Sequence, residues 1–220
     1  MPQNRTLALL AALALALVAP AHVTPAHADE TGRTIDYTIT RNGDAIGTHR
    51  VRFQERDGQR TVEHELHIRV FVLTLEAYSY DLRAREVWRG RQLVGFTATT
   101  DRNGEALQVF ARRGGSSIRI RGADGARTTA PGHAIPADPH YDVLSPGDAL
   151  MIEAEDGALR RVRVSAPRQE TLTVAGRRLA TRRYDVRGEH VASLWYDADG
   201  YLVKKRLQAT DGSIVITEMR

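Results

Sequence analysis

The chain of 220 residues has no cysteine and only two lysines, Lys204 and Lys205. Without cysteine, no disulfide can hold the fold together, so burial and hydrogen bonding must do so. For an exported protein, this composition fits the bacterial periplasm better than it fits a small disulfide-stapled toxin or hormone. The length suffices for one domain with a sizeable core or for two small lobes.

Long apolar segments are missing after the first 28 residues. Those first residues have the pattern of a secretory signal peptide, with Arg5 before an apolar run, residues 7–19, that is short for a bilayer span. Ala26-His27-Ala28 is a small-x-small cleavage pattern, so we expect the mature chain to begin at Asp29. An uncleaved anchor is the alternative. We therefore expect a periplasmic protein that is peripheral to a membrane at most.

Clustered basic tracts are also missing, although the chain is basic. Lys and Arg number 31 against 27 Asp and Glu, and 29 of the 31 (31 − 2) are arginine. Because the arginines are scattered, we interpret their number as a mark of a GC-rich genome, and we expect no nucleic-acid partner. Anionic lipid head groups are the alternative partner that this charge suggests.

Catalytic motifs are missing as well. The chain has no G-x-S-x-G, no P-loop and no G-x-G-x-x-G, so neither a catalytic residue nor a cofactor is predicted, and the protein is not expected to be an enzyme. The stretch "HELH", residues 64–67, lacks the H-E-x-x-H spacing, and residues three apart on a strand point to opposite faces. No metal site is therefore predicted, and His64 is expected to be a hydrogen-bonded inner histidine.

What the chain does contain is alternation and turns. Seven Asn-Gly or Asp-Gly dipeptides separate segments in which apolar and polar residues alternate. The pattern predicts an all-β fold, a strongly curved antiparallel meander sheet that is rolled or forms a half-open barrel, with little helix. Residues 29–220 are expected to form a single β domain, with a proline-rich connection near 131–140 between two groups of strands.

The stretch "LWYDADGYLVKKRL", residues 194–207, resembles a calcium loop at first sight. Counting from Asp197, however, glycine is fourth and the twelfth residue is Gln208, so the EF-hand pattern fails. A hairpin with its turn at 199–200 is predicted instead, with Trp195 facing Lys204 and Tyr196 facing Val203. Lys204 or Arg206 would then lie over the indole.

A second aromatic face precedes a predicted turn at Arg89-Gly90. The even positions from Tyr78 to Trp88 share one side of this strand, and they include Glu86, which the turn would set opposite Leu93. A carboxylate on an apolar face needs a partner. Two interpretations are open, an internal salt bridge to an arginine or a polar anchor in a ligand cavity.

Four motifs resemble those of a family of exported bacterial β-proteins that carries a domain of unknown function. They are "NGDAIGTHRVRF", "REVWRGRQLVGFTATTDRNG", "GRRLATRRYDVRGE" and "LWYDADGYLVKKRLQATDGS", which together extend over nearly the whole mature chain. The resemblance implies a periplasmic, curved antiparallel sheet, similar in outline to half-open barrels that hold acyl chains. It implies no activity and no catalytic residues.

Two functions follow as hypotheses. The first is a non-enzymatic binding module for a hydrophobic or acidic amphiphilic ligand such as a lipid, with arginines at the mouth of an apolar groove. The second is a structural or assembly factor that binds another envelope protein through a strand edge or a basic face. The residues expected to line the groove are Tyr78, Tyr80, Leu82, Glu86, Trp88, Phe96, Trp195 and Tyr196.

Overall fold

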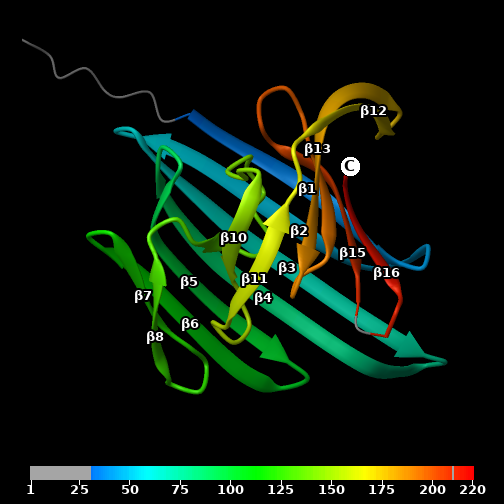
Figure 1. Ribbon diagram of the computed structural model, residues 1–220. Coiled ribbons are helices and arrows are strands. Elements are labelled where there is room, and N and C mark those ends of the chain that lie inside the picture. The colour runs from blue at the N-terminus through cyan, green and yellow to red at the C-terminus, as the bar shows by residue number, and fades with distance from the viewer. Residues whose placement is uncertain (1–30, 210) are drawn as a thin grey trace, which may run out of the picture.

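The computed structural model describes residues 31–209 and 211–220, and these residues form one open, curved β-sheet (Figure 1). The expected signal peptide, residues 1–28, lies outside the described residues. The first half of the sheet contains β1 (Thr31–Arg41), β2 (Asp44–Arg56), β3 (Gln59–Val72), β4 (Leu75–Arg89), β5 (Gln92–Arg102), β6 (Glu105–Gly114), β7 (Ser117–Arg121) and β8 (Arg127–Pro131). The second half contains β9 (Ile135–Pro136), β10 (Gly147–Ile152), β11 (Leu159–Val164), β12 (Arg168–Val174), β13 (Arg177–Gly188), β14 (Ala192–Tyr196), β15 (Leu202–Gln208) and β16 (Ile214–Met219).

The two halves meet where the first and last strands pair. The sheet order is β8-β7-β6-β5-β4-β3-β2-β1-β16-β15-β14-β13-β11-β10-β9, and β12 pairs with β13 beside this path. Every pairing is antiparallel except the short one between β9 and β10. The predicted all-β antiparallel fold is confirmed, and among the described strands the sheet does not close. No helix in the described part of the chain could span a membrane.

The predicted Asx-Gly turns join the early strands. Asn42, Asp57 and Asn103 have φ values between 51° and 53°, and each is followed by a glycine that also has positive φ. These are the conformations that two-residue hairpin loops require and that Asn, Asp and Gly adopt most readily. The local chemistry therefore explains the hairpins β1–β2, β2–β3 and β5–β6, whereas the turns β3–β4 and β4–β5 contain no Asx-Gly dipeptide.

The connection after β8 is part of the interior. It was expected near 131–140, and it runs from Gly132 to Pro146 with β9 inside it. Its Ala134, Ile135, Ala137, Val143 and Leu144 are buried in the same hydrophobic cluster as the strands. β10 and β11 follow it and cross in front of β3 to β6 (Figure 1). This segment therefore covers the concave side, called here the inner face.

Bulges and a close backbone contact accompany the curvature. The register shifts between Ile39 and Thr40 and between Val87 and Trp88, and such bulges bend a strand and increase its twist. At Gly47, a Cβ atom would lie 2.1 Å from the carbonyl oxygen of His67. Only glycine permits this approach of β2 to β3.

Candidate functional site

The outer face of β4 to β8 carries two rows of side chains that cross the strands. In the first row, Arg85, Thr97, Phe110, Arg121 and Arg127 are successive cross-strand partners. Successive side chains of a strand point to opposite faces of the sheet, so the residues next to this row in sequence, such as Ala111 and Ile120, are buried and the row faces solvent.

The second row lies two residues along each strand. It contains Val87, Gly95, Arg112, Arg119 and Thr129. Gly95 leaves a hollow between its cross-strand neighbours Val87 and Arg112, since it has no side chain. The two rows together place five arginines around Phe110.

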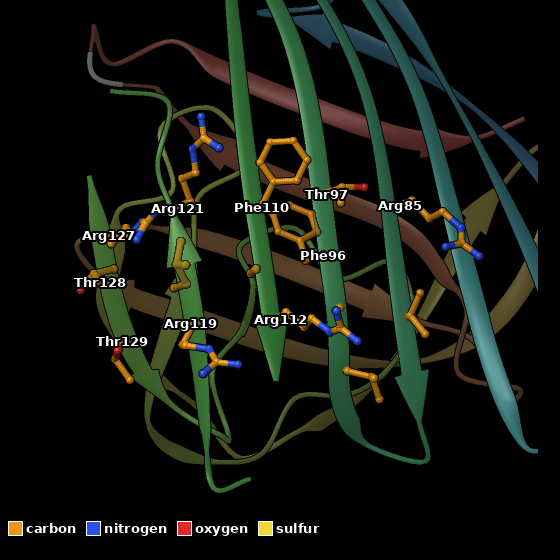
Figure 2. Close-up of a pocket in the computed structure, with 15 residues that line it drawn as sticks. Arg85, Phe96, Thr97, Phe110, Arg112, Arg119, Arg121, Arg127, Thr128 and Thr129 are labelled. Atoms are coloured by element: carbon orange, nitrogen blue, oxygen red, sulfur yellow. The ribbon is translucent and has the colours of Figure 1, made fainter. Parts of the chain in front are cut away.

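These residues surround a groove of about 800 Å³, which Figure 2 shows. The guanidinium groups of Arg112 and Arg119 lie on one side of Phe110 and those of Arg121 and Arg127 on the other, and Phe96 lies beneath the ring (Figure 2). The lining residues are Arg85, Val87, Val94, Gly95, Phe96, Thr97, Phe110, Ala111, Arg112, Arg119, Ile120, Arg121, Arg127, Thr128 and Thr129.

Four of these arginines have no acidic neighbour. Among residues 31–209 and 211–220, no carboxylate oxygen lies within 4.0 Å of the guanidinium nitrogens of Arg112, Arg119, Arg121 or Arg127. The fifth arginine differs, since Arg85 lies 3.8 Å from Glu63. The groove is therefore a concentration of uncompensated positive charge.

The arginines also face one another. Arg112 is directly opposite Arg119, and Arg121 is directly opposite Arg127. Like charges directly opposite across a ladder destabilise a sheet. Phe110, whose surface is 44% exposed, lies between these pairs, and the Arg121 guanidinium is 6.0 Å from its ring centroid. The arrangement can bind an anion next to an apolar group.

A second, smaller cavity of about 220 Å³ lies on the inner face. Of the residues expected in a groove, Tyr80, Leu82 and Glu86 line it. Lys205 also lines it and forms an ion pair with Asp138 at 2.8 Å. Burial would raise the pKa of the Asp138 carboxyl, but Lys205, His190 and His140 together outweigh burial and hold this pKa below its usual value.

The partner of Glu86 differs from the arginine that the sequence suggested. Glu86 is only 4% exposed, and its Oε2 accepts a hydrogen bond of 2.7 Å from the indole N–H of Trp88. Its Oε1 lies 3.2 Å from His64 Nε2, in an orientation short of a well-formed hydrogen bond. The expected inner position of His64 is confirmed, since it is buried and hydrogen-bonds to His49.

The structure disperses the other expected groove residues. Tyr78 stacks on Tyr80 with 6.4 Å between the ring centroids, and Phe96 lies under the outer groove. Tyr196 is buried, and its hydroxyl donates to the carbonyl of Pro139. The indole N–H of Trp195 donates to Glu170. These side chains therefore do not line one common groove.

Two predicted hairpin registers are wrong. A bulge between Trp195 and Tyr196 sets Tyr196 opposite Leu202, which turns Leu202 into the core, although the pairing of Trp195 with Lys204 holds. Arg183 lies over the Trp195 indole, 4.9 Å from the ring centroid, where Lys204 or Arg206 was expected. In the hairpin of β4 and β5, the turn falls at 90–91, and Glu86 lies opposite Phe96 in place of Leu93.

The arginine rows are what the sequence reasoning missed. The arginines are scattered along the chain, and only the strand register brings them together. A signal was present in the alternating segment "SIRIR", residues 117–121, where Arg119 and Arg121 share a face opposite Ile118 and Ile120.

The fold and the groove define the chain as an all-β protein in which an open, curved sheet carries an arginine-lined candidate site. A family model described as "Domain of unknown function (DUF6134)" matches residues 37–220, so the chain belongs to this family. No curated protein matches the chain. The expected membership in a family with a domain of unknown function is thereby confirmed, and the family's description names no activity, ligand or partner.

Proposed function

We propose that the protein is an exported, non-enzymatic binding module for an anionic amphiphile, a molecule with a phosphate or carboxylate head and an apolar chain. The observation that carries this proposal is the convergence, around the exposed ring of Phe110, of four arginines that have no acidic partner in the part of the chain that the structure describes. A head group would accept hydrogen bonds from the arginines, and the chain would cover Phe110 and fill the hollow at Gly95.

Contacts of the head group and of the apolar chain should both contribute to the free energy of binding. Hydrogen bonds to charged groups contribute about 1.5–3 kcal/mol each when they are shielded from water, and less at an exposed site. Each buried CH₂ group of the chain adds about 0.8 kcal/mol. A bound anion would also offset the repulsion between Arg112 and Arg119 and between Arg121 and Arg127.

The test is a calorimetric titration with decyl phosphate below its micelle concentration, with decanol and inorganic phosphate as partial ligands. The R119T/R121T variant should bind decyl phosphate about 30-fold more weakly, which corresponds to about 1 kcal/mol for each lost contact. The R177T/R178T variant loses the same charge from exposed positions on β13 and should bind as the wild type does.

A second variant separates the groove from general attraction between charges. In G95L, a Cβ atom would have its nearest contact at 3.9 Å, from the carbonyl oxygen of Ala111, so the strand accommodates a side chain there. The leucine should weaken decyl phosphate binding and leave inorganic phosphate binding unchanged. Equal binding of decyl phosphate by wild type, R119T/R121T and G95L would overturn the proposal.

Export belongs to the same proposal. It rests on the leader pattern of residues 1–28, and it places the ligand in the cell envelope. Fractionation of cells that express the full chain should find it in the periplasm, with Asp29 as its first residue. Recovery of the uncleaved chain from the cytoplasm would refute this part of the proposal.

The hairpin tip between β3 and β4 favours a second candidate function, assembly with another envelope protein. Phe71, Val72, Leu73 and Leu75 are exposed there, and Leu73 is 96% exposed. Contiguous exposed apolar groups mark contact sites. A photo-crosslinker at position 73 should give one discrete adduct in cells, which L75D should abolish. A crosslinker at the exposed Arg178 is the control, and the same adduct there would refute this candidate.

A further inference from the structure

Three histidines from distant parts of the chain meet in the interior. His49 lies on β2, His64 on β3, and His140 in the connection that covers the inner face. Each is at most 7% exposed, and one ring nitrogen of each lies within 4.8 Å of the corresponding nitrogens of the other two. The His49–His140 and His64–His140 ring centroids are 4.5 and 5.1 Å apart.

The hydrogen bonds of the cluster fix which nitrogens carry lone pairs. His140 Nδ1 is 2.9 Å from the carbonyl oxygen of Asp138 and must donate to it, which leaves the lone pair on Nε2. His140 Nε2 is buried and has no hydrogen-bond partner among the described residues. His64 Nε2 faces the Glu86 carboxylate, which can only accept, so the lone pair of His64 is on Nδ1.

The third nitrogen of the set is His49 Nε2. It lies 3.2 Å from His64 Nδ1, and in the absence of a metal it must donate to this nitrogen. A metal ion between the two nitrogens would replace this hydrogen bond, with the proton of His49 carried on Nδ1 instead. Burial, then the neighbouring His140, lowers the pKa of His49 well below its usual value, and burial does the same for His140. Both rings are therefore neutral at pH 7, which is the form that binds metal ions.

The spacing suits one ion. Tetrahedral zinc with Zn–N bonds of about 2.0–2.1 Å holds its ligand nitrogens about 3.3 Å apart. The His49–His64 pair already has this separation, and the others, which lie within 4.8 Å, need to close by at most about 1.5 Å. His140 Nε2 also indicates a bound ion, because a buried lone pair without a hydrogen-bond partner costs free energy.

A carboxylate orients the set, as in many metal sites. Glu86 faces the far nitrogen of His64 and is itself held by the Trp88 indole N–H. Such a carboxylate fixes the tautomer of a metal-binding histidine and raises its basicity. Among the described residues, no lysine or arginine nitrogen lies within 4.0 Å of Glu86, so a cation at the histidines would lie beside a carboxylate that no basic side chain pairs with.

We propose that His49, His64 and His140 bind a divalent transition-metal ion of the zinc type, with Glu86 as the carboxylate that orients His64. All three histidines and Glu86 line the inner cavity of about 220 Å³. The fourth coordination position would face this space, where Lys205 favours water-derived hydroxide or another anion. This site is on the opposite face of the sheet from the arginine groove, and it does not depend on the function proposed for that groove.

The test uses the full mature chain after dialysis against a chelator. Zn²⁺ is titrated in competition with a chromogenic chelator, and Co²⁺ is followed by its visible absorption, which reports the coordination geometry of the ion. The wild type should bind one ion per chain with tetrahedral Co²⁺ bands, and Zn²⁺ should raise its melting temperature. The H67Q variant changes a histidine on the same strand outside the cluster, and it should behave as the wild type does.

Two variants make the proposal refutable. H140Q should abolish stoichiometric binding and the zinc-dependent rise in melting temperature, with folding checked by circular dichroism in the metal-free state. E86Q keeps all three ligands and should bind Zn²⁺ about 10–100-fold more weakly. The proposal is overturned if the wild type shows no Co²⁺ bands, or if E86Q and folded H140Q bind Zn²⁺ as the wild type does.

Discussion

Removal of arginines from the outer groove should stabilise the protein while it weakens ligand binding. Arg119 faces Arg112 across the ladder, and Arg121 faces Arg127. Opposed like charges contribute about 0.2–1 kcal/mol of destabilisation per pair, and these solvent-exposed side chains belong in the lower half of that range. The R119T/R121T variant relieves both pairs and places threonine, a residue that strands favour, at both positions.

The net gain should be about 0.5 kcal/mol. Relief of two pairs gives about 0.4–1 kcal/mol, and loss of the distant Arg121–Phe110 contact removes a few tenths of a kcal/mol. With a urea m-value of about 2 kcal/mol/M, the unfolding midpoint should rise by about 0.25 M at low salt. At about 1 M salt, where the Debye length is about 3 Å, most of the gain should vanish.

The control is R177T/R178T, which removes equal charge from positions opposite Val174 and Thr173, where no arginine is paired. It should leave the midpoint nearly unchanged at both salt concentrations. If R119T/R121T were less stable than the wild type, or if its gain were independent of salt, the arginines would be structural and the reasoning would be refuted.

Three further outcomes are expected. Asp138→Asn leaves the buried Lys205 ammonium without its carboxylate, and urea unfolding at pH 7 should show a loss of about 1–2 kcal/mol, since the Asp138 side chain is 47% exposed and solvent screens the pair. The pKa of Asp138 is depressed in the folded state, so the stability from this ion pair is present above the unfolded-state pKa of about 3.9 and is lost as the pH falls toward the folded-state pKa. The difference in free energy of unfolding between wild type and D138N should therefore decrease as the pH is lowered. Tyr37→Phe orphans the carbonyl of Leu202, which accepts from the Tyr37 hydroxyl at 2.8 Å, and should lower the free energy of unfolding by about 1–2 kcal/mol in the same assay. Intact mass spectrometry of the exported protein should find cleavage after Ala28, and replacement of this residue by tryptophan should leave the leader attached.

The general fold could be predicted because its determinants are local. Apolar alternation and Asx-Gly dipeptides act within about ten residues, and the positive φ values at Asn42, Asp57 and Asn103 show the turns where the dipeptides placed them. The bulges could not be predicted, since they depend on packing between strands. The bulge after Trp195 reverses the side on which Leu202 lies, while Lys204 and the residues after it keep the predicted register.

The candidate sites depend on contacts that no local pattern encodes. Arg112, Arg121 and Arg127 become neighbours only through the registers of β6, β7 and β8. His140 comes from the connection, 76 residues (140 − 64) after His64, in a segment without periodicity. The inner position of His64 could be predicted from its strand, but the histidine spacing within one strand does not indicate a metal site, because the third histidine comes from the connection.

The most direct test of the central claim is native mass spectrometry of the protein purified from the cells that produce it. If the arginine groove holds an anionic amphiphile, the wild type and R177T/R178T should each carry an adduct that fragments to a phosphate- or carboxylate-bearing molecule with an apolar chain, and R119T/R121T should be bare. An adduct retained equally by all three proteins, or a bare wild type, would contradict the account.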